Sequence, residues 1–200
     1  MRFPMNKVAW LLAIVAPAAL AWTNVNIALR VQPTSKLWVT GTSTVKSFAC
    51  QAKSFDALVD ATLPDAVAAV LAGEKGVHSV ALKVPTDKMD CGSGTMNGHM
   101  LNALKAKQNP EIVFELSSYD LAKIADGVGV KIAGTLALGG VKKDITIDAT
   151  AKAGPDGTLL VTGTYPLKMS EWGLKPPTLM LGTLKVNENV KVNFELLLKP

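Results

Sequence analysis

An alternation of apolar and polar residues with a period of two runs through most of this chain, and it limits the possible folds more than any other feature. In an extended strand, successive side chains point to opposite faces, so this pattern gives each strand one apolar and one polar face. It is clearest in residues 130–138 and 190–199. It recurs in six further segments: 37–40, 48–53, 79–84, 112–117, 144–150 and 159–165. Such strands are typical of antiparallel sheets with one face on a core.

Turn and helix signals separate the predicted strands. Gly139-Gly140 and Pro155-Asp156-Gly157 are typical of tight turns, because proline fixes φ and glycine accepts a positive φ. A short helix is predicted over Asp65–Leu71, which is rich in alanine and follows a proline. A second helix is predicted over Met96–Lys107, where apolar residues recur on one face. The pattern therefore predicts a single all-β domain with two short helices, built as an antiparallel eight-stranded barrel or sandwich.

The first 21 residues differ from the rest and predict a cleaved signal peptide. Arg2 and Lys7 precede an apolar run over residues 8–20, which ends in small residues around Ala21. An uncleaved membrane anchor is the alternative, although the run is shorter than the ~20 apolar residues that span a bilayer. We therefore predict a periplasmic or secreted protein that has a signal peptide at 1–21, an N-terminal connecting segment at 22–34 and a barrel domain at 35–200.

The two cysteines of the chain are Cys50 and Cys91. Export to an oxidising compartment favours a disulfide between them. Such a bond closes a loop of about forty residues and, in the chain-entropy description, adds roughly 3–4 kcal/mol to stability. The alternative is a reactive cysteine nucleophile, which no neighbouring residue in the sequence supports.

The charge distribution argues against nucleic-acid binding. The formal net charge is +5, and removal of Arg2 and Lys7 with the leader lowers it to +3. The lysines are scattered and few aromatic residues lie between them. A nucleic-acid surface needs a dense basic patch, so no nucleic-acid partner is expected.

Motifs for catalysis and metal binding are also missing from the sequence. The two histidines, His78 and His99, do not occur in a zinc-ligand spacing, and no GxSxG motif marks a catalytic serine. Asp144 and Asp148 share a strand face, but lie roughly 13 Å apart along it, too far for a catalytic pair. We therefore predict no catalytic residues, no metal site and no cofactor.

Seven segments together resemble the YceI-like, or polyisoprenoid-binding, family of exported bacterial proteins. No single segment decides the matter, but their order and spacing are fairly specific. They are Leu37–Ser43, Val77–Pro85, Met96–Lys105, Pro110–Phe114, Gly134–Val141, Met169–Pro177 and Gly182–Val186.

This resemblance implies a lipocalin-like antiparallel barrel that is open at one end and holds a long isoprenoid or similar lipid chain. It implies no catalytic residues, and it raises a homodimer as one option because family members are often dimers. Two features depart from the family pattern. Cys50 and Cys91 are additional, and Glu171-Trp172 stands where Asp-Phe is usual.

The expected partner is a hydrophobic small molecule such as an isoprenoid, a quinone or a fatty-acid-like lipid. Period two predicts that one set of residues lines the barrel, and the loop after residue 168 predicts three more near its mouth, with Trp172 as one wall of the entrance. The first set is Val80, Leu82, Phe114, Leu136, Leu138, Ile145, Ile147, Val192 and Phe194, and the second is Met169, Trp172 and Met180. Each of these residues could instead be ordinary core, because most apolar stripes are.

Two other functions remain open at this stage. The barrel could be packed solid by its own side chains, in which case the chain would be a stress-related structural protein with a protein partner. An exported hydrolase would need a polar cluster in a cleft, which the sequence does not offer. The volume of the interior separates a ligand pocket from a filled barrel.

Overall fold

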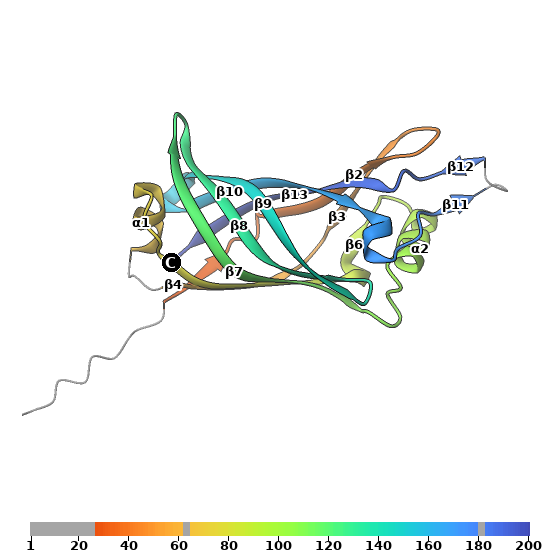
Figure 1. The fold of residues 1–200 in the computed structure, drawn as a ribbon, viewed down its shortest axis with the longest axis horizontal. Helices are drawn as coiled ribbons and strands as arrows, with labels where there is room; N and C mark the ends of the chain where they lie inside the picture. Colours follow the sequence, from red (N-terminus) through yellow and green to blue (C-terminus); the bar gives the residue numbers. More distant parts are fainter. Residues whose placement is uncertain (1–26, 62–64, 180–182) are drawn as a thin grey trace, which may run out of the picture.

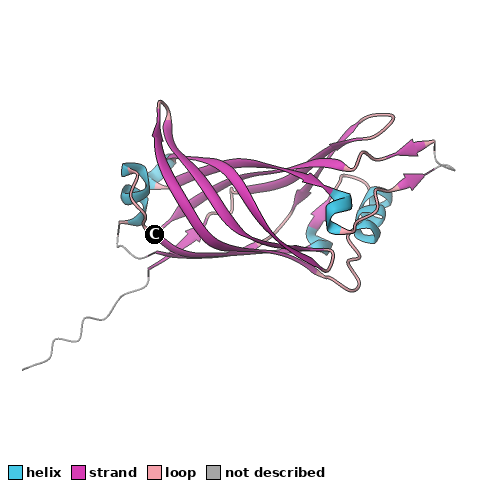
Figure 2. Ribbon diagram, in the orientation of Figure 1, coloured by secondary structure: helices cyan, strands magenta, loops and turns pink. Residues whose placement is uncertain are grey.

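The computed structural model describes residues 27–61, 65–179 and 183–200, and these residues form a closed antiparallel barrel (Figures 1 and 2). Five long strands run consecutively around one side, and each pairs with the next. They are β7 (Glu111–Ile124), β8 (Gly127–Leu138), β9 (Val141–Ala153), β10 (Leu159–Lys168) and β13 (Asn189–Lys199).

The other side of the barrel is built from pairs of shorter strands that lie end to end. Strands β1 (Ile27–Val31) and β2 (Lys36–Thr42) both pair with β13, and β1 thereby closes the ring. Next to them lie β4 (Asp56–Ala61) and β3 (Ser47–Ala52), followed by β5 (Val77–Pro85) and β6 (Met89–Asp90). Strand β5 pairs with β7. Counting each end-to-end pair once, the described residues form an eight-stranded barrel, as the sequence predicted.

The sequence did not predict three strands of the barrel, namely β1, β4 and the two-residue β6. The segment 22–34 was expected to be a connection, but Ile27–Val31 is strand β1, so the barrel begins earlier than residue 35. Strand β4 was also missed. Its outward face carries the exposed Leu58, while Ala57 and Ala61 are small inward residues. Apolar residues on both faces leave little contrast between them, so the alternation is weak in the sequence.

Helix α1 (Ala66–Ala72) packs against β8 and β9 at one end of the barrel (Figure 1). Its N-cap is Asp65, whose side chain accepts a hydrogen bond from the Ala68 backbone N–H. The helix ends at Gly73, which adopts a left-handed φ of +85° that glycine accepts easily. It buries the inward-facing Val67 and Val70 in the core. The predicted helix over 65–71 is therefore present within one residue at each end.

Helix α2 (Gly94–Ala103) lies at the opposite end of the barrel, the end beyond which the hairpin of β11 (Thr178–Leu179) and β12 (Leu184–Lys185) extends in Figure 1. The expected helix ran on to Lys107, but the helix ends at Ala103. Lys105 takes a left-handed φ of 54°, and the Ala106 N–H bonds back to Leu101 O at 2.9 Å. Three short 3-10 turns complete the described elements: Thr86–Lys88, Pro155–Gly157 and Met169–Trp172.

Candidate ligand-binding cavity

The interior of the barrel is open rather than packed, and it encloses a cavity of about 720 Å³. Inward-facing side chains from the barrel strands line it, and α2 contributes several residues at its end of the barrel. This volume falls within the ~300–1,000 Å³ range of small-molecule sites. The sequence left open whether the barrel is hollow or filled, and the structure has a hollow one.

Ten of the twelve residues predicted for the site lie on the wall of this cavity. They are Val80, Leu82, Phe114, Leu136, Leu138, Ile145, Ile147, Met169, Val192 and Phe194. Nine of them are strand residues that period two assigned to the inward face, because alternate residues of a strand lie on the same side of the sheet, and Met169 was assigned to the mouth. Whether a ligand touches them stays a prediction.

Three phenylalanines lie over glycines of the neighbouring strand. A Cβ built on Gly163 would come within 3.0 Å of the Phe194 ring, and Gly163 is its direct cross-strand partner. Phe48 covers Gly41 in the same way, and Phe114 covers Gly134. Because these glycines have no side chain, the rings can lie against the barrel wall, where larger neighbours would push them into the lumen. This arrangement helps to explain how an interior lined with large residues stays open.

Polar side chains on the cavity wall gather mainly at the α2 end. The described lining includes Ser43 and Lys46 from the turn between β2 and β3, and Ser93, Thr95 and His99 from the start of α2 and from the helix itself. The wall also includes two tyrosines, Tyr119 and Tyr165, which the sequence did not predict. The wall as a whole remains almost entirely apolar, so these side chains add little polar surface to the cavity.

The hydroxyl groups of the two cavity tyrosines lie in different surroundings. The hydroxyl of Tyr119 donates to Val77 O at 3.2 Å and accepts from the Val77 N–H at 3.0 Å, which satisfies it within the protein. Burial raises the pKa of Tyr165, and the negative charge of Glu171 raises it further. Both effects keep the Tyr165 phenol protonated, so it adds no charge to the apolar wall.

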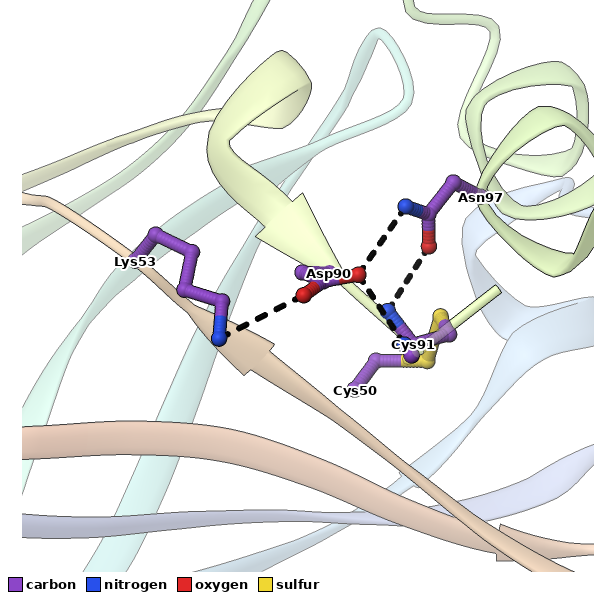
Figure 3. A network of polar contacts seen from close by, with 6 residues as sticks. Cys50, Lys53, Asp90, Cys91 and Asn97 are labelled. Atoms are coloured by element: carbon purple, nitrogen blue, oxygen red, sulfur yellow. Dashed lines mark hydrogen bonds and ion pairs between the residues drawn. A yellow bond between two sulfur atoms is a disulfide. The ribbon is translucent and has the colours of Figure 1, made fainter. Parts of the chain in front are cut away.

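A polar network fixes the start of α2 to the barrel (Figure 3). The Asp90 carboxylate accepts from Asn97 Nδ2 at 3.0 Å and from the Gly92 N–H at 2.9 Å, and Lys53 Nζ lies 3.3 Å from it. Asn97 Oδ1 in turn accepts from the Cys91 N–H at 2.7 Å. The hydrogen bond from Asn97, followed by those from Gly92 and Lys53, lowers the pKa of Asp90 below its ordinary value.

The Cys50–Cys91 disulfide reinforces the same junction. It joins β3 to the segment between β6 and α2, and both cysteines lie on the cavity wall (Figure 3). The predicted pairing is therefore confirmed, and neither thiol is free to act as a nucleophile. The cross-link anchors the segment that leads into α2 at this end of the cavity.

Trp172 does not form a wall of the entrance as the sequence analysis expected. It is 1% exposed, lies in a core cluster with Leu138, Leu167 and Leu174, and is not on the cavity wall. The 3-10 turn at Met169–Trp172 directs its indole into this core, while Met169 reaches the cavity. The sequence alone cannot separate these directions, because the turn breaks the period of two. Met180 lies outside the described residues.

No group of three or more His, Cys, Asp or Glu side chains in the residues that the structure describes lies close enough to hold a metal ion. None of the described helices is long and apolar enough to cross a membrane. Asp144, considered above as half of a carboxylate pair, accepts a hydrogen bond from Thr135 Oγ1 at 2.9 Å.

A closed antiparallel barrel around an apolar cavity defines a lipocalin-like barrel protein. The sequence narrows this class further: a family model described as the YceI-like domain matches residues 25–198. The chain therefore belongs to the YceI-like family. No match was found among curated protein sequences.

Solved structures share the fold at low sequence identity. BcnA of Burkholderia cenocepacia is 21% identical with a TM-score of 0.67, over 84% of this chain and 99% of that one. A YceI protein of Campylobacter jejuni is 21% identical with a TM-score of 0.55, over 74% and 82%. A polyisoprenoid-binding domain from Saccharophagus degradans, implicated in plant cell wall breakdown, is 15% identical with a TM-score of 0.59, over 86% and 97%. These similarities establish the fold.

Proposed function

We propose that this chain is an exported, non-enzymatic protein that holds an isoprenoid-type lipid, such as a quinone or a polyprenyl chain, inside its barrel. The observation that carries the proposal is the apolar cavity of about 720 Å³. Each CH₂ group moved from water into such a cavity contributes about 0.8 kcal/mol, so a long tail can bind tightly with few polar contacts. The solved polyisoprenoid-binding domain from Saccharophagus degradans shares the fold and supports this ligand class.

A cavity-filling substitution tests the proposal. Ile147 lines the cavity on β9, and its neighbour Thr146 faces outward and is exposed. Ile147→Trp should reduce the lipid that co-purifies with the protein several-fold, measured by solvent extraction and mass spectrometry, while Thr146→Trp should retain it. Repeated absence of lipid from the wild type, with no uptake of added quinone, would count against the proposal.

Export is the second part of the proposal. The apolar leader at 1–21 motivates it, and the Cys50–Cys91 bond is consistent with an oxidising compartment. Mass measurement of the protein from a periplasmic fraction should give a chain that begins close to residue 22, with both cysteines resistant to thiol labelling. A chain that keeps its leader would support the uncleaved anchor instead.

Two further possibilities concern the purified protein: that it is a homodimer, and that it is a structural protein. A homodimer was raised by the family resemblance, and light scattering of the purified protein measures it directly. The competing function, a structural protein with a protein partner, presupposed a packed barrel. The open cavity favours the ligand-binding proposal over it.

A further inference from the structure

The turn between β2 and β3 and the hairpin of β11 and β12 both extend beyond the end of the barrel that carries α2 (Figure 1), and hydrogen bonds join them. We call Ser43–Lys46 together with Thr183–Val186 the rim. The Thr44 N–H donates to Lys185 O at 3.0 Å, and the Lys185 N–H donates to Thr44 Oγ1 at 3.2 Å. Thr44 Oγ1 also donates to Thr183 O at 3.0 Å. The two segments are therefore hydrogen-bonded into one element.

An apolar side chain projects from this element into solvent. Val45 is 71% exposed, which makes it the most exposed large hydrophobic residue of the described chain. Its position is fixed, because Ser43 Oγ accepts from the Val45 N–H at 3.3 Å and the Ser43 N–H donates to Lys46 O at 2.8 Å. A turn held in this way presents Val45 at little further entropic cost.

The charges around Val45 are positive. The sequence of residues 42–47 and 177–186 contains Lys46 and Lys185 and no acidic residue. Within the described residues neither lysine forms an ion pair. Lys185 interacts electrostatically with Glu188, but Glu188 is itself paired with Lys168 at 3.5 Å. An exposed apolar residue between cations complements an anionic lipid surface.

The rim is also part of the cavity wall. Val45, Lys46, Leu184 and Val186 all line the cavity, so a surface that contacts the rim also contacts residues of the cavity wall. The other turn with an exposed apolar residue joins β7 and β8, and it differs from the rim in its charge and in its position. Ile124 is 47% exposed at the α1 end, and its hairpin carries the carboxylate of Asp126.

From the exposure, the charge and the position of the rim, we propose that it docks the protein onto the surface of a bilayer that contains anionic phospholipid, with Val45 inserted between the headgroups. This proposal goes beyond the ligand of the cavity, because it concerns the contact that brings this end of the barrel to a membrane. One hydrophobic residue and two lysines predict weak, reversible attachment that salt weakens.

Leu58 provides a matched control, since it is 69% exposed but lies on the outer wall of β4. In a flotation assay, the complete mature chain should float with vesicles of phosphatidylethanolamine and phosphatidylglycerol. A smaller fraction should float at high salt. Val45→Asp should lower the partition coefficient about tenfold, because it removes the inserted group and adds a negative charge. Leu58→Asp should change it less than twofold, and Lys46→Glu with Lys185→Glu should abolish the preference for anionic vesicles.

Thermal melting and light scattering of each variant accompany the flotation, so that unfolding and association are seen separately. Failure of wild-type protein to bind vesicles, or equal effects of Val45→Asp and Leu58→Asp, overturns the docking proposal. A change in molar mass on Val45→Asp, with vesicle binding intact, also overturns it and assigns the rim to a contact between copies. Loss of vesicle binding in Val45→Asp but not in Leu58→Asp supports docking even if the cavity takes up no quinone. The docking proposal and the ligand proposal can therefore fail independently.

Discussion

The ring of Phe194 occupies the space that a side chain on Gly163 would need, and the two residues are direct partners across β10 and β13. Phe194 is also part of the cavity wall. The glycine thus sets how far the ring lies from the centre of the barrel. A substitution at Gly163 should act on the cavity through Phe194.

We expect Gly163→Ala to push the Phe194 ring into the lumen, to reduce the bound lipid and to cost about 1–3 kcal/mol of stability through overpacking. Gly129→Ala is the control on β8, because a Cβ there meets only ordinary contacts at 3.4 Å or more. Lipid content by mass spectrometry and denaturant unfolding measure the two effects. Equal lipid content in both variants would show that Phe194 has room to move elsewhere.

Trp172→Ala should destabilise the protein by about 3–5 kcal/mol, because it leaves a large cavity in a closed core. Lipid retention should be unchanged under conditions where the variant stays folded, because Trp172 does not line the cavity. Trp172→Phe should cost less, since the buried Trp172 Nε1 has no hydrogen-bond partner to lose in the described structure. Reduced lipid retention with an unchanged unfolding free energy would instead support the prediction that Trp172 forms a wall of the entrance.

Replacing both cysteines by serine should lower the unfolding free energy by roughly 3–4 kcal/mol, because Cys50 and Cys91 are separated by 41 residues. The amides of α2 should also exchange faster with solvent, since the cross-link holds the segment that leads into this helix. Hydrogen exchange followed by mass spectrometry measures the local effect. Reduced wild-type protein should behave like the double variant, and unchanged exchange in α2 would limit the disulfide to a global role.

The attachment of α2 should weaken in acid through Asp90. Its folded-state pKa lies below the ordinary value of 3.8, so its contribution to stability is fully present above that pH. The contribution is lost as the pH falls through the lowered folded-state pKa. Protection factors of α2 amides, corrected for intrinsic exchange, should therefore drop in this acidic range.

Asp90→Asn should loosen α2 at neutral pH and remove most of the further loss in acid, because Asn97 and Gly92 then face a neutral side chain. Asp87→Asn is the control, since Asp87 forms only an exposed pair with Lys88 at 3.5 Å. That variant should keep the wild-type pH dependence. An unchanged acid response in Asp90→Asn would assign the response to other carboxylates.

The sequence by itself predicted an all-β antiparallel fold, most of its strands and the set of residues expected to face inward. In β8 the inward residues Val130, Ile132, Leu136 and Leu138 could be read directly from the alternation, and all of them line the cavity. This works because the two faces of a strand follow from local backbone geometry, which needs no knowledge of the neighbours. The Cys50–Cys91 pairing was equally accessible, because only one intramolecular pairing of two cysteines exists.

Only the tertiary structure decided whether the interior is open and which way the irregular segments turn. The space inside depends on which residues meet across strands, as where Gly163 lies under Phe194, and such meetings are fixed by register between distant segments. The direction of Trp172 depends on a 3-10 turn that breaks the alternation. The two hairpins of the rim are 139 residues apart at Thr44 and Thr183, so their union and the exposure of Val45 arise only when the barrel closes.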